Sequence, residues 1–189
     1  MDKIIVLIGA PGAGKGTQAV VVAERLGIPH VSTGDIFRTN VASGTQLGLE
    51  AQKYMDAGED VPDSVTNEMV RARLAQPDAA GGFLLDGYPR TLAQVDELAG
   101  MLAEHGAAID KVVELTVDTD EVVGRLVKRA AEQGRSDDTE DVIRRRQEIF
   151  AEQTAPLTAV YAEQGVLVKV DGMGSVEDVT ARVLAALGA

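Results

Sequence analysis

The chain has 189 residues, 45% of them hydrophobic and 25% charged, which is the composition of an ordinary globular protein. This length predicts a single domain, residues 1–189, with a sizeable buried core. The formal net charge of −12 argues against a nucleic-acid partner, because phosphates would be repelled over most of the surface. No apolar run approaches the ~18 residues of a membrane span, and zero cysteines exclude disulfides and thiolate catalysis. We therefore expect a cytoplasmic protein with no membrane partner.

A glycine-rich loop follows the first predicted strand, Ile4–Ile8, and opens a predicted helix. This order turns backbone N–H groups and the positive end of the helix toward one point, which suits phosphate oxygens, and Lys15 would reach the outer phosphates of a nucleotide. Gly16 stands where the pattern G-x-x-x-x-G-K-[ST] has Ser or Thr, but the hydroxyl of Thr17 can still face a Mg²⁺ ion. The alternative is a plain strand-to-helix turn with a solvated lysine. The loop reads Gly9-Ala10-Pro11-Gly12-Ala13-Gly14-Lys15-Gly16-Thr17.

Buried apolar runs alternate with helical patterns along the rest of the chain. The alternation predicts an α/β fold with a doubly wound, parallel five-stranded sheet flanked by helices. Thr91 with Gln94, and Ser175 with Asp178, are typical of helix starts. The predicted strands are Ile4–Ile8, Pro29–Ser32, Phe83–Leu85, Val112–Val117 and Val166–Val170, and the predicted helices are Lys15–Leu26, Leu92–Glu104, Thr119–Ala131, 138–164 and Val176–Leu187.

Two stretches interrupt the regular alternation. The first, Thr33–Gly82, holds several short helical patterns where one crossover helix would suffice, and Pro62-Asp63 starts one of them. We expect an extra subdomain there. The second, Ala130–Gly134, is a short break between two helices, with an arginine on each side.

Seven of the 18 Lys and Arg residues fall between Arg125 and Arg146. Guanidinium groups grip phosphates through two hydrogen bonds and stay charged at any working pH, so this cluster favours phosphate chemistry. The alternative is a solvated helix face, because acidic residues are interleaved with the basic ones. The two histidines, His30 and His105, are expected at a strand entry and a helix end.

Four motifs in this order resemble the nucleoside monophosphate kinases, and specifically the adenylate kinase family. The resemblance covers the whole chain, and in this family GKGT replaces GK[ST], which accounts for Gly16. The motifs are Gly9–Gln18, Ser32-Thr33-Gly34-Asp35 with Arg38, Asp86-Gly87-Tyr88-Pro89-Arg90 with Gln94, and the arginines from 125 to 146.

The resemblance implies reversible, Mg²⁺-dependent transfer of the ATP γ-phosphoryl group to AMP, giving ADP from both. It assigns Arg129 to the ATP side, Arg135 and Arg146 to the monophosphate or the transferring group, and Arg125 to the lid. Arg144 and Arg145 are left as surface residues, because three adjacent helical arginines cannot all face one site. The implied catalytic residues are Lys15, Arg90, Arg125, Arg129, Arg135 and Arg146; the ATP contacts are Gly12, Ala13, Gly14, Lys15, Gly16, Thr17, Arg129 and Gly174; the AMP contacts are Thr33, Arg38, Glu59, Asp60, Val61, Gly87, Tyr88, Pro89, Arg90, Gln94, Arg135 and Arg146.

Further details also follow from the resemblance. Asp86, at the carboxyl edge of its strand, would hold Mg²⁺ through water or cap the following turn. The Tyr88-Pro89 bond is expected to be cis. Gln94 would read adenine, or alternatively bend back to cap its own helix. The implied excursions are an acceptor-binding segment, 32–61, and a short lid, 125–137, with no structural zinc.

Two other functions compete with this one. A UMP/CMP kinase would share the scaffold, but Thr33 and Gln94 both match the adenine-reading pattern. A regulatory GTPase would need an N-K-x-D element, and the only asparagines, Asn40 and Asn67, do not lie in one. We expect a monomer whose partners are the small molecules ATP, AMP and ADP.

Overall fold

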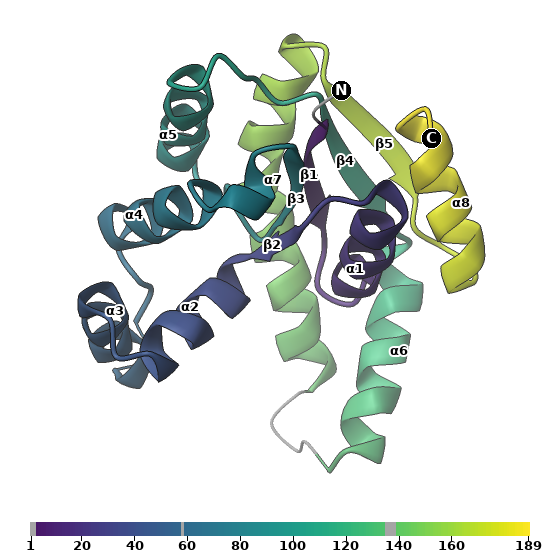
Figure 1. Cartoon of the computed structure of the whole chain (residues 1–189). Helices are drawn as coiled ribbons and strands as arrows, with labels where there is room; N and C mark the ends of the chain where they lie inside the picture. Colours follow the sequence, from purple (N-terminus) through teal and green to yellow (C-terminus); the bar gives the residue numbers. More distant parts are fainter. Residues whose placement is uncertain (1–2, 58, 135–138) are drawn as a thin grey trace. The chain divides into compact units, whose positions relative to one another are not determined.

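The computed structural model describes residues 3–57, 59–134 and 139–189, and within them it contains a five-stranded sheet with strand order β2-β3-β1-β4-β5 (Figure 1). Strand β2 pairs in parallel with β3, and β4 pairs in parallel with β5. The predicted α/β fold is therefore confirmed. The strands are β1 (Lys3–Gly9), β2 (His30–Ser32), β3 (Gly82–Asp86), β4 (Lys111–Thr116) and β5 (Leu167–Asp171). The α-helices are α1 (Lys15–Leu26), α2 (Thr33–Ala42), α3 (Gln46–Asp56), α4 (Asp63–Leu74), α5 (Leu92–Ala103), α6 (Thr119–Glu132), α7 (Glu140–Glu163) and α8 (Val176–Ala186), and a short 3₁₀ helix, η1, spans Pro77–Ala79.

The backbone forms two compact units. The first unit comprises the described residues up to Val6 together with Ala23–Asp110, and the second comprises Leu7–Val22 together with Lys111–Ala189. The first unit holds β2 and β3 with helices α2 to α5, and the second holds β4 and β5 with helices α6 to α8. Strand β1 and helix α1 each run through both units. None of the helices in the described ranges has the length and apolar character needed to cross a lipid bilayer.

The apolar runs of the sequence form the buried strands. Residues Ile4–Ile8 of β1 are buried, as is the whole of β3. Leu84 and Leu85 in the first unit, and Val112 and Val113 in the second, are fully excluded from solvent. Burial on both faces explains why these strands are continuously apolar rather than alternating.

Side-chain caps mark the helix starts. Thr91 Oγ1 accepts a hydrogen bond from the Gln94 N–H at 3.1 Å, and Ser175 Oγ accepts one from the Asp178 N–H at 3.1 Å. Both caps were predicted from the sequence. The long stretch from Thr33 to Gly82 holds α2, α3, α4 and η1, as its several helical patterns indicated.

The predicted break at Ala130–Gly134 is wrong in its first half. Helix α6 continues to Glu132 and is capped at Gln133. Alanine and glutamate are strong helix formers, so the helix ends only near Gly134, whose φ of +65° leaves the right-handed region. The second part of the expected lid, from residue 135 to 137, lies outside the described residues.

Gly82 begins β3 where its backbone approaches β1 closely. Its φ is +114°, and a Cβ atom there would lie 2.4 Å from the Lys3 carbonyl oxygen. A side chain at this position is therefore both strained and obstructed.

We expect Gly82→Ala to lower the free energy of unfolding by more than ~2 kcal/mol, because a strained non-glycine backbone costs about 1–3 kcal/mol before the clash is counted. The matched control is Gly81→Ala, where a Cβ atom meets nothing within 4 Å, and where we expect a change of at most ~1 kcal/mol. Urea denaturation of the two variants makes the comparison, and equal stabilities would contradict the predicted steric role.

Candidate functional site

The phosphate loop of the second unit joins β1 to α1. Strand β1 ends at Gly9, and α1 begins at Lys15. Between them the loop turns tightly, with the Ala13 N–H donating to the Ala10 carbonyl at 3.0 Å. The first turn of α1 contains no acidic residue, so no side-chain carboxylate of that turn offsets the positive end of the helix dipole. The predicted ATP contacts from Gly12 to Thr17 therefore lie on a loop and helix start suited to an anion.

Side chains of helices α6 and α7 contact this loop. A Cβ atom on Gly12 would lie 3.0 Å from side-chain atoms of both Val122 and Leu126 on α6. From α7, Gln147 Nε2 donates to the Pro11 carbonyl at 2.6 Å, and Gln147 is only 7% exposed. The contact of Gln147 was not predicted, because a single glutamine after three arginines carries no local signal of a partner 136 positions away.

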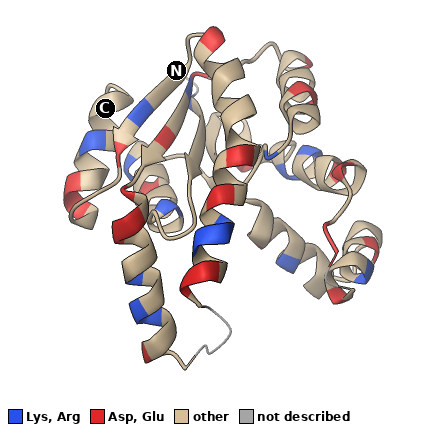
Figure 2. Ribbon diagram, turned by 180° about the vertical axis from the view of Figure 1, so that it is seen from behind, with Lys and Arg blue, Asp and Glu red and all other residues tan. Residues whose placement is uncertain are grey.

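Two of the predicted arginines meet the loop around one cavity of about 170 Å³. Arg129 of α6 and Arg146 of α7 line it together with Pro11 and Gln147. Figure 2 shows the basic residues of α6 and α7 among acidic residues on the same helices. A small cavity lined by two arginines beside a phosphate loop is suited to phosphate oxygens. Its remaining lining residues are Leu126, Ala130, Gln133 and Ile143.

The other arginines of the cluster have different surroundings. Arg144 donates to Asp120 at 2.8 Å and to Glu140 at 2.9 Å, and these hydrogen bonds raise the pKa of Arg144. Arg145 donates to Glu148 at 3.0 Å, and neither Arg144 nor Arg145 lines the cavity. The expectation that these two arginines are surface residues is thus met.

Arg125 is not among the residues that line the cavity. Arg125 lies one turn before Arg129 and donates to Glu121 at 2.5 Å on the same helix. This exposed ion pair is worth little energy, so an incoming anion can displace it at small cost. Arg135 lies outside the described residues, so its predicted catalytic and AMP-binding roles remain predictions.

The loop after β5 carries Gly174, the predicted backbone contact to the base of ATP. Gly174 has a φ of +109°. Arg182 of α8 fastens the loop, because its Nη1 donates to the carbonyl oxygens of Asp171 at 3.0 Å and Met173 at 2.5 Å. The second unit therefore holds the predicted ATP-side residues that the structure describes.

In the first unit, three predicted AMP contacts meet at Gly87. Its carbonyl oxygen accepts from Thr33 Oγ1 at 3.4 Å and from Arg90 Nε at 3.0 Å. A Cβ atom on Gly87 would lie 2.8 Å from Thr33 Oγ1, so a larger residue would displace the threonine hydroxyl. The three residues come from the β2–α2 junction and the loop after β3, which are joined through the pairing of β2 with β3.

Gln94 lies beside this cluster and is only 5% exposed. Its Oε1 accepts from the Arg90 N–H at 2.6 Å, and its Nε2 donates to Asp63 Oδ1 at 2.7 Å. The amide thus bends back to the chain, as the capping alternative required, although it meets the N–H of Arg90 rather than that of the cap residue Thr91. Asp63 was predicted only as a helix start, and nothing in the sequence pattern pairs it with Gln94.

Asp86 closes β3 and is 7% exposed. Its Oδ2 lies 3.1 Å from His30 Nε2, a contact between adjacent parallel strands. His30 was predicted at the start of its strand, but its contact with Asp86 was not predicted. Among the residues described, no group of three or more His, Cys, Asp or Glu side chains could hold a metal ion.

The Tyr88-Pro89 peptide bond is cis, which confirms the prediction. Tyr88 is 1% exposed, and its hydroxyl donates to Asn67 Oδ1 at 2.8 Å. Its side chain therefore belongs to the core, and a contact between this residue and a nucleotide would have to come from its backbone.

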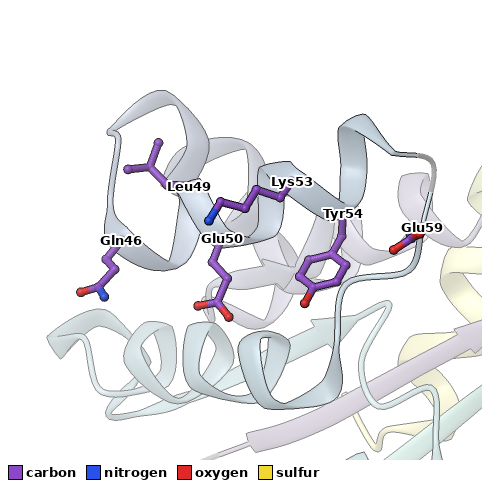
Figure 3. Close-up of a pocket in the computed structure, with 6 residues that line it drawn as sticks. All are labelled: Gln46, Leu49, Glu50, Lys53, Tyr54 and Glu59. Carbon is purple, nitrogen blue, oxygen red and sulfur yellow. The ribbon is translucent and has the colours of Figure 1, made fainter.

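The remaining predicted AMP contacts lie on or near α2 and α3. Arg38 forms an exposed ion pair with Asp35 one turn earlier. Glu59 lines an open hollow beside α3, with its side chain on the same hollow as Glu50, Lys53 and Tyr54 (Figure 3). The hollow mixes two carboxylates with one ammonium group and so has no clear preference for an anion. Asp60 is exposed and Val61 half-buried in the segment that leads to α4.

The second unit has the features of a class of proteins, the α/β proteins with a phosphate loop between the first strand and the first helix, and two arginines line a cavity beside that loop. Comparison with known sequences makes this specific, because the profile of the adenylate kinase family matches residues 7–166. An adenylate kinase from Nocardioides sp. is 62% identical over 183 residues, covering 97% of this chain and 96% of that protein. Adenylate kinases from Kocuria rhizophila and Thermobifida fusca are 61% and 56% identical, each over 97% of both chains.

The chain therefore belongs to the adenylate kinase family. The class of enzyme is phosphotransferase, as the four motifs of the sequence indicated.

We expect Arg146→Ala to lower kcat by ~10²-fold while changing the KM for ATP much less, because a group aimed at developing charge stabilises the transition state more than the ground state. The matched control is Arg145→Ala, which removes the neighbouring guanidinium from an exposed ion pair and should change kcat by less than ~3-fold. Steady-state kinetics with varied ATP separates the two parameters. Equal small effects would support a solvated helix face instead.

Proposed function

We propose that this enzyme catalyses the reversible, Mg²⁺-dependent transfer of the γ-phosphoryl group of ATP to AMP, which yields ADP from both nucleotides. The observation that carries the proposal is the cavity lined by Arg129, Arg146 and the phosphate loop. Family membership supports it, because the similar proteins from three organisms are all adenylate kinases.

In the proposed reaction, a phosphate oxygen of AMP attacks the γ-phosphorus of ATP. The bond from that phosphorus to the β,γ-bridging oxygen breaks, and ADP leaves with the electron pair. No general base is needed, because the second pKa of a phosphate monoester is about 6 and its oxygen is already a nucleophile at neutral pH. The protein therefore contributes positioning and charge stabilisation.

The second unit is proposed to bind ATP. Backbone N–H groups from Gly12 to Thr17 would hold its phosphates, and Lys15 would reach the outer ones. Arg129 and Arg146 would neutralise charge on the transferring group, helped by Arg125 and Arg135 from the proposed lid, 125–137. The backbone at Gly174, fastened by Arg182, would contact the adenine of ATP.

The first unit is proposed to bind AMP, with the excursion 32–61 forming part of the acceptor site. Arg38 and Arg90 would hold the α-phosphate, Thr33 and Gln94 would face the base, and the backbone of 59–61 and 87–89 would line the remainder. The convergence of Thr33 and Arg90 on the Gly87 carbonyl supports this assignment, because it joins three predicted contacts in one cluster.

Magnesium fits the chemistry of the residues present. Mg²⁺ keeps several of its waters and is usually held by one or two carboxylates and substrate phosphates, so a cage of protein ligands is not required. Asp86 is the one carboxylate counted as buried among the described residues of the first unit, and it would hold the ion through water. In the second unit, the hydroxyl of Thr17 is the oxygen proposed to face Mg²⁺. The ion supplies charge that offsets the developing negative charge on the phosphate oxygens.

We also propose that the enzyme is a cytoplasmic monomer. Its exposed large hydrophobic residues are spread over α1, α3, α5, α7 and α8, and single exposed residues of this kind do not indicate an interface. Light scattering at micromolar concentration tests the monomer directly.

We expect Lys15→Met to retain less than ~1% of the wild-type kcat, because a lost stabilising charge costs ~10²-fold or more. Lys128→Met is the matched control, since Lys128 is exposed on α6 and lies 4.0 Å from Glu132. Circular dichroism should find both variants folded. A folded Lys15→Met enzyme with more than a tenth of wild-type turnover would refute the phosphate-loop assignment.

The acceptor is tested with the wild-type enzyme. Phosphoryl transfer from ATP to AMP should exceed phosphoryl transfer from ATP to UMP or CMP by ~10² to 10⁴ in kcat/KM, because each buried polar group left without its partner costs about 1–3 kcal/mol. Similar rates with UMP or CMP would favour a pyrimidine nucleotide kinase. Hydrolysis of GTP alone, without transfer to AMP, would favour a GTPase.

A further inference from the structure

Gln94, Thr91 and Asp63 of the first unit form a closed ring of hydrogen bonds, and Arg90 adds a further hydrogen bond to the Gln94 amide. Thr91 Oγ1 accepts from the backbone N–H of Gln94 at 3.1 Å and donates to Asp63 Oδ2 at 3.1 Å. Asp63 Oδ1 accepts from Gln94 Nε2 at 2.7 Å, and Gln94 Oε1 accepts from the backbone N–H of Arg90 at 2.6 Å. The ring connects the first turns of α4 and α5, which pack together.

The hydrogen-bond partners of the Gln94 amide fix which way it points. The backbone N–H of Arg90 can only donate, so it must face the amide oxygen, and an ionised carboxylate can only accept, so it must face the amide nitrogen. A flipped amide would place two donors together at Arg90 and two acceptors together at Asp63. Within the described part of the chain, the Gln94 amide makes two hydrogen bonds, one to the Arg90 N–H and one to Asp63. One lone pair of its oxygen and one of its N–H groups therefore remain for a ligand.

The direction of the amide decides which purine it can bind. Adenine presents an acceptor at N1 and a donor at its 6-amino group, so it pairs with an amide that donates from nitrogen and accepts at oxygen. A 6-oxopurine, such as hypoxanthine, presents the reverse pattern, with a donor at N1–H and an acceptor at O6. A freely rotating amide would serve both bases by flipping, whereas a fixed one can serve only one of them.

We propose that Asp63 determines acceptor specificity as a positioning residue, by holding the Gln94 amide in the one orientation that reads adenine and rejects 6-oxopurines. The inference rests on the proposed function, in which Gln94 faces the base of AMP. It extends that function from adenine against pyrimidines to adenine against its nearest purine analogue. Asp63 touches Gln94 and Thr91, and it acts on the base through Gln94.

The Arg90 N–H by itself constrains the orientation of the Gln94 amide less than Arg90 and Asp63 do together. Loss of the Asp63 carboxylate removes one charge-assisted hydrogen bond that stabilises the observed orientation of the Gln94 amide. It also removes the repulsion that the amide oxygen would meet at Asp63 in the flipped orientation. Hydrogen bonds to charged groups are the stronger kind, so we expect discrimination to fall by ~10- to 100-fold when Asp63 is replaced.

The experiment compares AMP with IMP, which differ only in the atoms at and next to position 6 of the base. The ratio of kcat/KM for AMP to that for IMP is measured for the wild type, Asp63→Asn and Asp63→Ala, with ATP saturating. The asparagine variant keeps the shape of Asp63 but can either accept or donate, so it tolerates both amide orientations. Binding of AMP and of IMP to the same proteins, followed by calorimetry, gives the ratio without turnover.

The control is Asp78→Asn, which neutralises another carboxylate of the first unit. Asp78 accepts from Arg73 at 2.8 and 2.9 Å, and this pairing lowers its pKa. It belongs to η1 and has no contact with the ring, so the AMP-to-IMP ratio should stay at the wild-type value.

The proposal requires a wild-type preference for AMP that falls in both Asp63 variants and stays unchanged in Asp78→Asn. If Asp63→Ala fails to fold, Asp63→Asn decides by itself. Wild-type use of IMP as good as that of AMP would overturn the role of Asp63, as would a general loss of activity in the variants with an unchanged ratio. A wild-type enzyme that neither bound nor phosphorylated AMP would instead refute the proposed function, and this inference with it.

Discussion

Binding phosphates on an acidic chain is the physical constraint on which the rest of the structure depends. The net charge of −12 makes the average field around the protein repulsive to nucleotides. The second unit opposes this field locally, with the first turn of α1 free of carboxylates and with two guanidinium groups at one small cavity. Helix dipoles and guanidinium charges do not change near neutral pH, so the attraction is permanent. Gln147 and the side chains of α6 then keep the loop in place.

Helix periodicity decides which arginines can take part. Adjacent residues on an α-helix project about 100° apart, so Arg144, Arg145 and Arg146 cannot point in one direction. Only Arg146 lines the cavity, and its two neighbours are paired with carboxylates at the surface. Arg144 and Arg145 are paired with acidic residues, so the interpretation as a solvated helix face holds for these two, whereas the phosphate-binding role of Arg146 remains a proposal.

In the first unit, side chains that complete the fold also belong to the proposed acceptor site. Gln94 is buried, and a buried amide must satisfy its hydrogen bonds, so its orientation is set by Arg90 and Asp63 before any ligand arrives. Contacts to the chain do not prevent the base contact proposed for Gln94, because an amide can make more hydrogen bonds than the two that it makes to Arg90 and Asp63. Gly87 combines roles in a similar way, since its carbonyl orders Thr33 and Arg90 while its lack of a side chain leaves the hydroxyl in place.

Local sequence determined the strands, most helix boundaries, the caps at Thr91 and Ser175 and the phosphate loop, because periodicity, capping chemistry and glycine geometry act over a few residues. The family resemblance supplied the proposed roles of the arginines, and it predicted the cis bond before Pro89, which the structure confirms. The tertiary structure alone decided the contacts of Gln147 with Pro11, His30 with Asp86 and Asp63 with Gln94, whose partners lie 136, 56 and 31 positions apart. Such pairs leave no local pattern, because they form only where separate strands and helices pack together.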